Sequence, residues 1–279
     1  MIIWLASYPK SGNTWLRFFI ISLLMGKKTN LNLNHLKAIL SYPDKSQFKG
    51  LISDFLDLEQ VAKNWITSQD KINHDNSLRL FKTHNIFGKF KSYPFTNDKN
   101  TLATIHIVRD PRNIVTSFSH HFQLQPEQAL ESLLSHQYLG QTSKDHCTTY
   151  IASWKYHFNS WKVFRRFNKY LLVRYEDLVN DTEKTFLNIL KFIAHLGQVK
   201  FSLDKEKFEN TLKTTGFEKM RALESKESFA EAKEDKITGK KIKFFNMGIK
   251  NDWKKLLDKN IIESLDKELT DEMKELNYL

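Results

Sequence analysis

A polar loop close to the start of the sequence has the composition of an anion-binding site. Residues 7–15 read Ser-Tyr-Pro-Lys-Ser-Gly-Asn-Thr-Trp and lie between two apolar runs. Small Ser11 and Gly12 would let the backbone approach a phosphate closely, and Lys10 would add a full positive charge. A helix that begins here would add free N–H groups and its dipole. The loop therefore indicates phosphate or sulfate chemistry, although a strand-to-helix turn with a solvated lysine would look the same in isolation.

The loop does not have the pattern of an ordinary ATP-binding loop. That pattern needs Gly, four residues, and then Gly-Lys-Ser or Gly-Lys-Thr. Here Lys10 precedes Gly12, and no second glycine lies upstream. An ordinary ATP-binding loop is therefore disfavoured.

A lysine and a histidine follow at the end of a second apolar run. Residues 79–84 read Arg-Leu-Phe-Lys-Thr-His. Lys82 and His84 are two residues apart, so in a strand they would lie on the same side and face one cleft at the ligand-binding edge of a sheet. A cation beside an imidazole suits proton transfer, but a surface pair would give the same spacing.

A second candidate anion site lies in residues 105–117, which read Ile-His-Ile-Val-Arg-Asp-Pro-Arg-Asn-Ile-Val-Thr-Ser. Arg109 can bind a phosphate with two parallel N–H groups, and Ser117 can donate a hydroxyl from about two turns along the next helix. Taken alone, Arg-Asp-Pro is also compatible with an ion pair and turn at a helix start.

Strands that alternate with helices are expected to position these residues. Apolar runs predict strands at 2–6, 78–82, 102–108 and 170–174, and helical patterns follow at 14–25, 112–122 and 181–195. This alternation predicts an α/β fold whose central parallel sheet has helices on both faces. Two more helices are expected beside that sheet, at 127–139 and 145–167.

A single domain is expected over residues 1–279. Residues 222–246 carry many charges and no clear apolar period, which predicts a mobile loop and not a linker between domains. Residues 237–255 contain six Lys and one Asp, which suits either a solvated basic face or an anion-binding lid.

Charge and cysteine content narrow the class of protein further. The 43 Lys and Arg against 32 Asp and Glu give a net charge of +11, so anionic ligands are expected. The single Cys147 forms no internal disulfide, which suits a reducing compartment. No leader pattern and no membrane-spanning run is found, so a cytoplasmic location is expected.

The loop at residues 8–15 resembles the 5′-phosphosulfate loop of cytosolic-type sulfotransferases, which typically have Thr where this chain has Asn13. The resemblance implies a P-loop NTPase-like sulfotransferase fold and the donor 3′-phosphoadenosine 5′-phosphosulfate (PAPS), with 3′-phosphoadenosine 5′-phosphate (PAP) as product. By the same resemblance, Lys10 contacts the leaving-group side of the sulfuryl centre and Trp15 stacks on adenine. The residues implied to hold the 5′-phosphate are Ser11, Gly12, Asn13 and Thr14.

The other motifs resemble segments of the same family in the same order. The family's catalytic histidine lies in a Lys-Thr-His segment like that of His84, and its 3′-phosphate motif is similar to the one that contains Arg109 and Ser117. Weaker matches imply that Tyr175 reaches the nucleotide and that residues 215–220 line the adenine. The residues implied there are Thr215, Phe217 and Met220.

The C-terminal match departs from the family's pattern. Residues 246–248 read Asn-Met-Gly where Arg-Lys-Gly is usual. Asn246, Met247 and Gly248 are still expected to contact the cofactor, either through backbone N–H groups or with Lys243 or Lys250 in place of the missing arginine. The family's dimerisation segment is absent after Trp253, so no oligomeric state is predicted.

The expected function is sulfuryl transfer from PAPS to a hydroxyl acceptor, with an amine left open. His84 is expected to take the acceptor proton, and Lys10 and Lys82 to stabilise the leaving oxygen, without a metal. The acceptor is a small molecule, glycan or lipid. Two alternatives are a P-loop kinase that uses ATP and Mg²⁺ and, less favoured because recognition motifs are missing, a basic nucleic-acid-binding protein.

Overall fold

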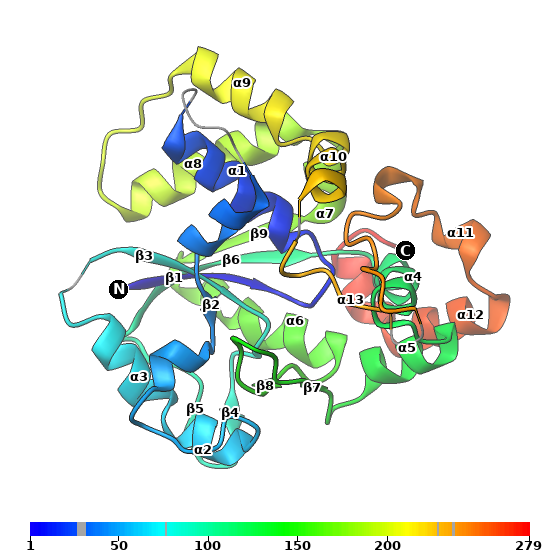
Figure 1. Ribbon diagram of the computed structural model, residues 1–279, viewed down its shortest axis with the longest axis horizontal. Helices are drawn as coiled ribbons and strands as arrows, with labels where there is room; N and C mark the ends of the chain where they lie inside the picture. The colour runs from blue at the N-terminus through cyan, green and yellow to red at the C-terminus, as the bar shows by residue number, and fades with distance from the viewer. Residues whose placement is uncertain (27–31, 76, 228, 236–237) are drawn as a thin grey trace.

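Five parallel strands form the centre of the computed structural model, which describes residues 1–26, 32–75, 77–227, 229–235 and 238–279. Their order across the sheet is β2-β3-β1-β6-β9, so the first strand lies in the middle (Figure 1). This confirms the predicted parallel sheet. The strands are β1 Ile2–Ser7, β2 Ser41–Tyr42, β3 Arg79–Thr83, β6 Thr101–Val108 and β9 Tyr170–Arg174.

Both faces of β1 are buried, which explains its continuous apolar sequence. Ile3 and Leu5 pack into the core on one face of the sheet. Trp4 and Ala6 point to the other face, where the Trp4 ring packs 5.2 Å from the ring of Phe95. Alternate residues of one strand therefore hold two separate cores together.

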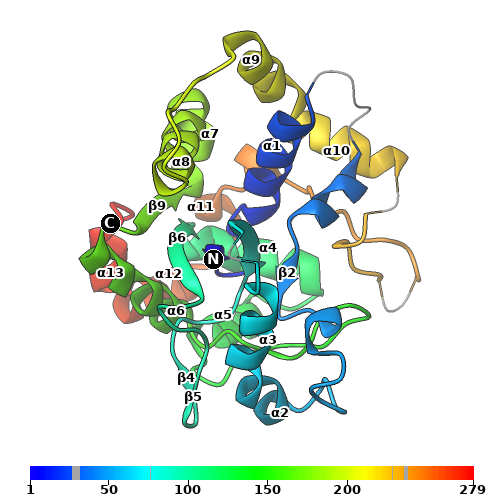
Figure 2. The same ribbon diagram turned by 90° about the vertical axis from the view of Figure 1, so that its left-hand side faces the viewer.

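Helices cover both faces of the sheet (Figure 1, Figure 2). One face carries α1 Asn13–Met25, α7 Tyr175–Asn180, α8 Thr182–Leu196, α9 Lys205–Thr214 and α10 Phe217–Lys226. The other face carries α2 Leu58–Lys63, α3 Trp65–Ile72 and α6 Trp154–Lys162. Near the carboxyl ends of the strands lie α4 Pro111–Phe122, α5 Pro126–Leu134, α11 Trp253–Leu256, α12 Lys259–Glu268 and α13 Thr270–Glu275.

The predicted helix at 145–167 is wrong over its first part, because α6 begins only at Trp154. Ala152 has a left-handed φ of 58°, and its N–H donates to the carbonyl of Tyr138 at 2.9 Å. Ser153 then caps the first turn of α6. Hydrogen bonds to residues distant in the sequence thus satisfy backbone groups that would otherwise have bonded within a helix.

Two other expectations about the chain's helices need correction. The helix expected at 127–139 ends at Leu134. The loop expected at 222–246 begins later, because α10 continues to Lys226. Residues 228, 236 and 237 of that loop lie outside the described residues, while a bridge pairs Glu234 with Lys241. In the described ranges, no helix combines the length and apolarity needed to cross a bilayer.

Candidate active site

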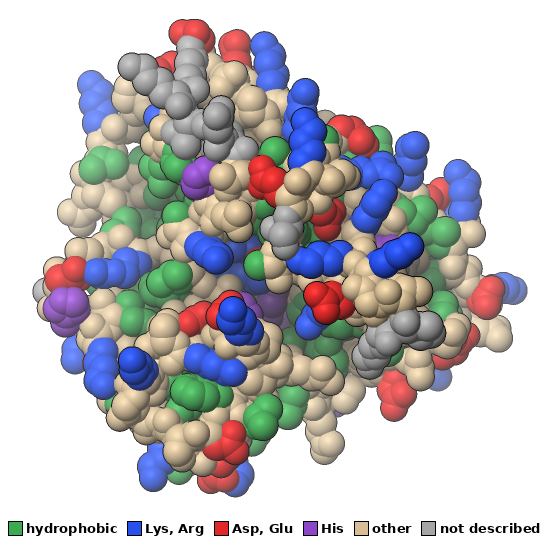
Figure 3. Space-filling view, viewed as in Figure 1, with side chains coloured by type: hydrophobic (Ala, Val, Ile, Leu, Met, Phe, Trp, Pro, Cys, Tyr) green, Lys and Arg blue, Asp and Glu red, His purple; other side chains and the backbone are tan. Residues whose placement is uncertain are grey.

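The carboxyl ends of four neighbouring strands bring the candidate residues together. Lys10 follows β1, His84 follows β3, Arg109 follows β6 and Tyr175 follows β9. Arg109 Nη1 donates to the carbonyl oxygen of Lys10 at 3.1 Å, and its guanidinium lies 4.2 Å from the centre of the Tyr175 ring. The residues that follow β1, β6 and β9 are therefore in direct contact. Lys, Arg and His side chains gather in a hollow on this side of the molecule (Figure 3).

The backbone at Gly12 requires glycine for two reasons. Its φ of 102° is one that other residues rarely adopt, and a Cβ there would lie 2.6 Å from the Tyr175 ring. Tyr175 also packs edge-on against Trp15, with 6.2 Å between the ring centres. The aromatic side chains thus hold the loop tightly against the start of α1.

The side chain of Asn13 is engaged inside the protein. Its Nδ2 donates to the carbonyl of Leu5 at 2.8 Å and to Ser7 Oγ at 3.2 Å, and its Oδ1 accepts from Arg17 Nε at 3.1 Å. These bonds tie the start of α1 to the end of β1. The amide side chain of Asn13 is therefore occupied within the protein, and its backbone N–H is the group left to face a ligand.

Several buried polar atoms around the loop find no hydrogen-bond partner within the described part of the chain. They include Ser11 Oγ, Trp15 Nε1 and Arg109 Nε. Buried donors without partners are costly, so the grouping of these three around the loops is what a site for a polar ligand would show. Their position on the two candidate anion loops fits a nucleotide with anionic groups at both ends.

Lys10 and Lys82 bring two positive charges to the site. Lys10 Nζ lies 3.5 Å from the centre of the Phe244 ring. Burial lowers the pKa of Lys10 to about 7; Glu231 opposes this shift, whereas Arg109 and Lys82 reinforce it. A lysine with this pKa gains its charge most readily when an anion binds beside it.

Glu231 and Arg17 are in the site although the sequence patterns did not point to either. Glu231 accepts from Thr14 Oγ1 at 2.7 Å, and its carboxylate lies 2.5 Å from Arg17 Nη2 and 3.3 Å from Lys82 Nζ. Burial alone would raise the pKa of Glu231, but Arg17 and Lys82 hold it well below its usual value. One sequence signal was available for Arg17, which is the only charged residue between Thr14 and Met25.

Hydrogen bonding fixes the tautomer of His84. Its Nδ1 lies 2.6 Å from the carbonyl oxygen of Ser7. A carbonyl oxygen only accepts, so Nδ1 carries the hydrogen and Nε2 keeps its lone pair. Burial and the nearby Lys82 hold the pKa of His84 well below its usual value, so the ring is neutral at pH 7. His84 is therefore in the form that can accept a proton.

The C-terminal segment closes over the start of α10. Gly248 has a φ of 56°, and a Cβ there would lie 2.6 Å from the Phe217 ring. Asn251 accepts from Thr116 Oγ1 at 2.6 Å and donates to the carbonyl of Asn113 at 3.0 Å. The segment that contains Asn246, Met247 and Gly248 is thus fastened to α4, the helix that follows Arg109.

The remaining candidate residues lie at differing depths around these loops. Ser117 is partly exposed on α4, while Thr215 and Met220 are buried around α10. The Thr215 hydroxyl donates to the carbonyl of Thr211 at 2.8 Å. The side chains of Thr215 and Met220 therefore support α10 from inside the protein.

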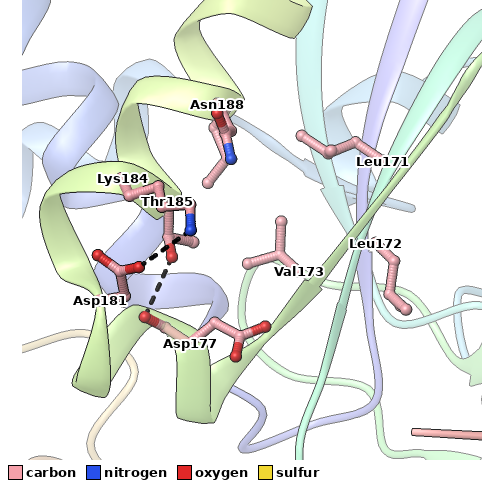
Figure 4. A pocket seen from close by; sticks show the side chains of 9 residues that line it. Leu171, Leu172, Val173, Asp177, Asp181, Lys184, Thr185 and Asn188 are labelled. Carbon is pink, nitrogen blue, oxygen red and sulfur yellow. Dashed lines mark hydrogen bonds and ion pairs between the residues drawn. The ribbon is translucent and has the colours of Figure 1, made fainter.

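Two surface cavities lie away from these loops. One, of about 270 Å³, is lined by β9 and α8 and includes Asp177 and Lys184 (Figure 4). The other, of about 510 Å³, lies between the end of α1 and the end of α8. Neither cavity is lined by Lys10, His84 or Arg109.

Comparisons with known proteins agree with this geometry. The model of the sulfotransferase domain family matches residues 2–277. Flavonol 3-sulfotransferase of Flaveria bidentis is 24% identical over 274 residues, which cover 95% of this chain and 79% of that protein. Sulfotransferase 2A6 of Mus musculus is 26% identical over 269 residues, which cover 96% and 82%.

Solved structures with the same fold include two complexes with PAP. Mouse sulfotransferase SULT7A1 complexed with PAP matches with a TM-score of 0.59 and 19% identity, over 98% of this chain and 84% of that one. Retinol dehydratase in a complex with retinol and PAP matches with a TM-score of 0.60 and 18% identity, over 98% and 81%. These likenesses agree with the expected P-loop NTPase-like sulfotransferase fold.

Proposed function

The chain belongs to the sulfotransferase domain family, and from this membership we propose that it transfers a sulfuryl group from PAPS to the hydroxyl group of a small-molecule, glycan or lipid acceptor. The observation that carries the proposal is the hydrogen bond between Arg109 and the Lys10 carbonyl. It supports one continuous cationic site built from two loops, which suits a nucleotide with phosphate at both ends. The complexes of SULT7A1 and retinol dehydratase with PAP support the same ligand.

We propose that the two loops hold opposite ends of the nucleotide. Ser11, Thr14 and the N–H groups after Gly12 would hold the 5′ end, because they lie just before or at the start of α1. Arg109 would hold the 3′-phosphate, together with residues proposed from the family resemblance: Ser117, Asn246, Met247 and Gly248. Around the adenine we propose Trp15, Tyr175, Thr215, Phe217 and Met220.

The proposed chemistry assigns two tasks to three side chains. Bound PAPS supplies a sulfuryl group attached to a phosphate that can leave. His84 Nε2 takes the proton of the acceptor hydroxyl, since its Nδ1 is held by the Ser7 carbonyl. Lys10 and Lys82 place positive charge where negative charge develops on the leaving oxygen. An amine acceptor would place the same demand on His84.

Several phenylalanines of the chain pack in or against its cores and do not by themselves identify the acceptor. Phe48, Phe87 and Phe90 belong to the core beneath β1, packed with Trp4. Phe122 packs in a different core beside α4. Core packing therefore explains these residues, and the acceptor has to be identified by experiment.

Thermal unfolding with different nucleotides tests the proposal. A ligand at a hundred times its Kd stabilises a protein by about 2.7 kcal/mol, which for a chain of this size corresponds to a Tm increase of several degrees. We expect this increase with PAP and a smaller one with ADP and Mg²⁺. A larger increase with ADP and Mg²⁺ would favour a kinase instead. Labelled PAPS incubated with cell metabolites would then identify the acceptor.

A further inference from the structure

One carboxylate of the chain already lies among the cations of the proposed donor site. Glu231 contacts Arg17, Thr14 and Lys82 through its two oxygens, at 2.5, 2.7 and 3.3 Å. Thr14 belongs to the proposed 5′-phosphate loop, and Lys82 is the proposed partner of the leaving oxygen. The carboxylate is therefore bound by two groups that are proposed to hold the anionic end of PAPS, and by Arg17 beside them.

Arg17 differs from the other cations because it is deeply buried. Its side chain is 3% exposed, whereas those of Lys82 and Glu231 are 13% and 22% exposed. Asn13 Oδ1 accepts from its Nε, which directs the rest of the guanidinium toward Thr14 and Glu231. A buried guanidinium that loses its anionic partner is strongly destabilised. Any molecule that displaces Glu231 must therefore offer Arg17 another anion.

A carboxylate and a phosphosulfate cannot share one set of cations, because like charges at this separation repel strongly. Resting on the proposed function, we propose that Arg17 binds the anionic 5′ end of the donor, and that Glu231 neutralises Arg17 only until the donor replaces it. Glu231 thus competes with the donor. The free energy of donor binding then depends on how much more strongly Arg17 pairs with the donor than with Glu231.

The segment that carries Glu231 lies outside the sheet. Glu231 lies in the non-helical stretch after α10, which Phe229 anchors by packing 5.1 Å from Phe244 and 5.7 Å from Phe245 between ring centres. Lys10 also lies over the Phe244 ring. A change in the position of Glu231 is therefore coupled to the residues that surround Lys10.

Calorimetric titration of PAP into matched variants tests the competition. Glu231→Gln keeps the size of the side chain and removes its charge, and it should tighten PAP binding roughly tenfold, the effect of about 1.4 kcal/mol. The same change should lower the Tm of the ligand-free protein, since Arg17 then loses its partner. Glu234→Gln is the control, because Glu234 is exposed in the same segment. It should change neither quantity.

Adenosine 3′-monophosphate distinguishes the 5′ end from the rest of the nucleotide. It lacks the 5′-phosphate, so Glu231→Gln should leave its affinity unchanged within about twofold. Equal tightening of PAP and of adenosine 3′-monophosphate would overturn the proposal, because the effect would then not arise at the 5′ end. PAP binding to Glu231→Gln that is unchanged or weaker would overturn it too.

Arg17 is tested in the Glu231→Gln background, where it has no carboxylate to hold. Adding Arg17→Gln should weaken PAP binding at least tenfold. Adding Arg17→Lys instead keeps the positive charge and should recover part of that affinity, which would show that the loss in Arg17→Gln does not come from misfolding. If PAP affinity did not change in either double variant, Arg17 would only be a partner of Glu231 and the proposal would fall. Absence of PAP binding to the wild-type protein would instead overturn the proposed function, and this inference with it.

Discussion

A single carbonyl oxygen decides which nitrogen of His84 is available for chemistry. The Ser7 carbonyl accepts from Nδ1 at 2.6 Å, so the proton of an acceptor has to go to Nε2. Ser7 ends β1 and directly precedes the loop that contains Lys10. The strand that leads to the anion-binding loop thus also orients the proposed base.

His84→Ala should lower kcat/KM for an unactivated alcohol by about 10²–10⁴-fold, the usual contribution of a general base. PAP affinity measured by calorimetry should remain within about twofold, because the proposed role of His84 is toward the acceptor and not the nucleotide. His74→Ala serves as the control, since His74 is exposed near the opposite end of β3. Near-normal turnover by His84→Ala would remove His84 from the mechanism.

The low pKa of Lys10 predicts how donor binding depends on pH. Burial lowers this pKa to about 7, with Arg109 and Lys82 adding to the shift and Glu231 and Glu224 opposing it. Above pH 7 the ligand-free lysine is mostly neutral, and an anionic ligand raises its pKa again. PAP binding should therefore weaken from pH 7 to pH 9 and take up a proton at pH 8.

Calorimetry at pH 8 in two buffers of different ionisation enthalpy measures this proton uptake directly. Lys10→Met should abolish it and should flatten the pH dependence of PAP affinity between pH 7 and pH 9. If Lys10→Met still took up a proton on binding PAP, the proton would have to go to a group other than Lys10.

At the scale of the elements, local patterns predicted the sheet and its loops because strand, turn and helix each leave a signal within a few residues. The loops that carry Lys10, His84 and Arg109 were found in this way. The Arg17–Glu231 pair was not, because it joins residues 214 positions apart. The wrong prediction of helix at 145–153 has a similar cause, since backbone N–H groups there donate to carbonyls of residues distant in the sequence.

The tight contact between the loop after β1 and the start of α7 can be tested at Gly12. Gly12→Ala introduces a left-handed alanine, which costs about 1–2 kcal/mol, and a clash with the Tyr175 ring that adds about 1–3 kcal/mol. Gly50→Ala is the matched control, because Gly50 also has a positive φ, of 75°, but has open space around it.

Urea unfolding should therefore show a larger loss of stability for Gly12→Ala than for Gly50→Ala, and only Gly12→Ala should weaken PAP binding. Equal losses in both variants would show that backbone strain alone matters and that the Tyr175 ring moves aside freely.

At the scale of the whole molecule, the net charge of +11 attracts anions before they reach the site. The association rate of PAP in stopped-flow fluorescence should therefore fall several-fold between about 0.05 and 0.5 M salt, as the screening length shortens. The dissociation rate should change less, because the bound anion lies among buried groups. An association rate that does not depend on salt would limit the role of charge to the site itself.

The place of β1 in the middle of the sheet has a consequence for biosynthesis. Ile2 pairs with Arg79 on one side and with Thr101 on the other, so β1 stays unpaired during synthesis until both of these later neighbours have been made. The proposed nucleotide site is complete only later, when Gly248 reaches Phe217 and Asn251 reaches α4. Retention of a translating chain on immobilised PAP would thus signal that residues 248–251 have been made and have folded into place.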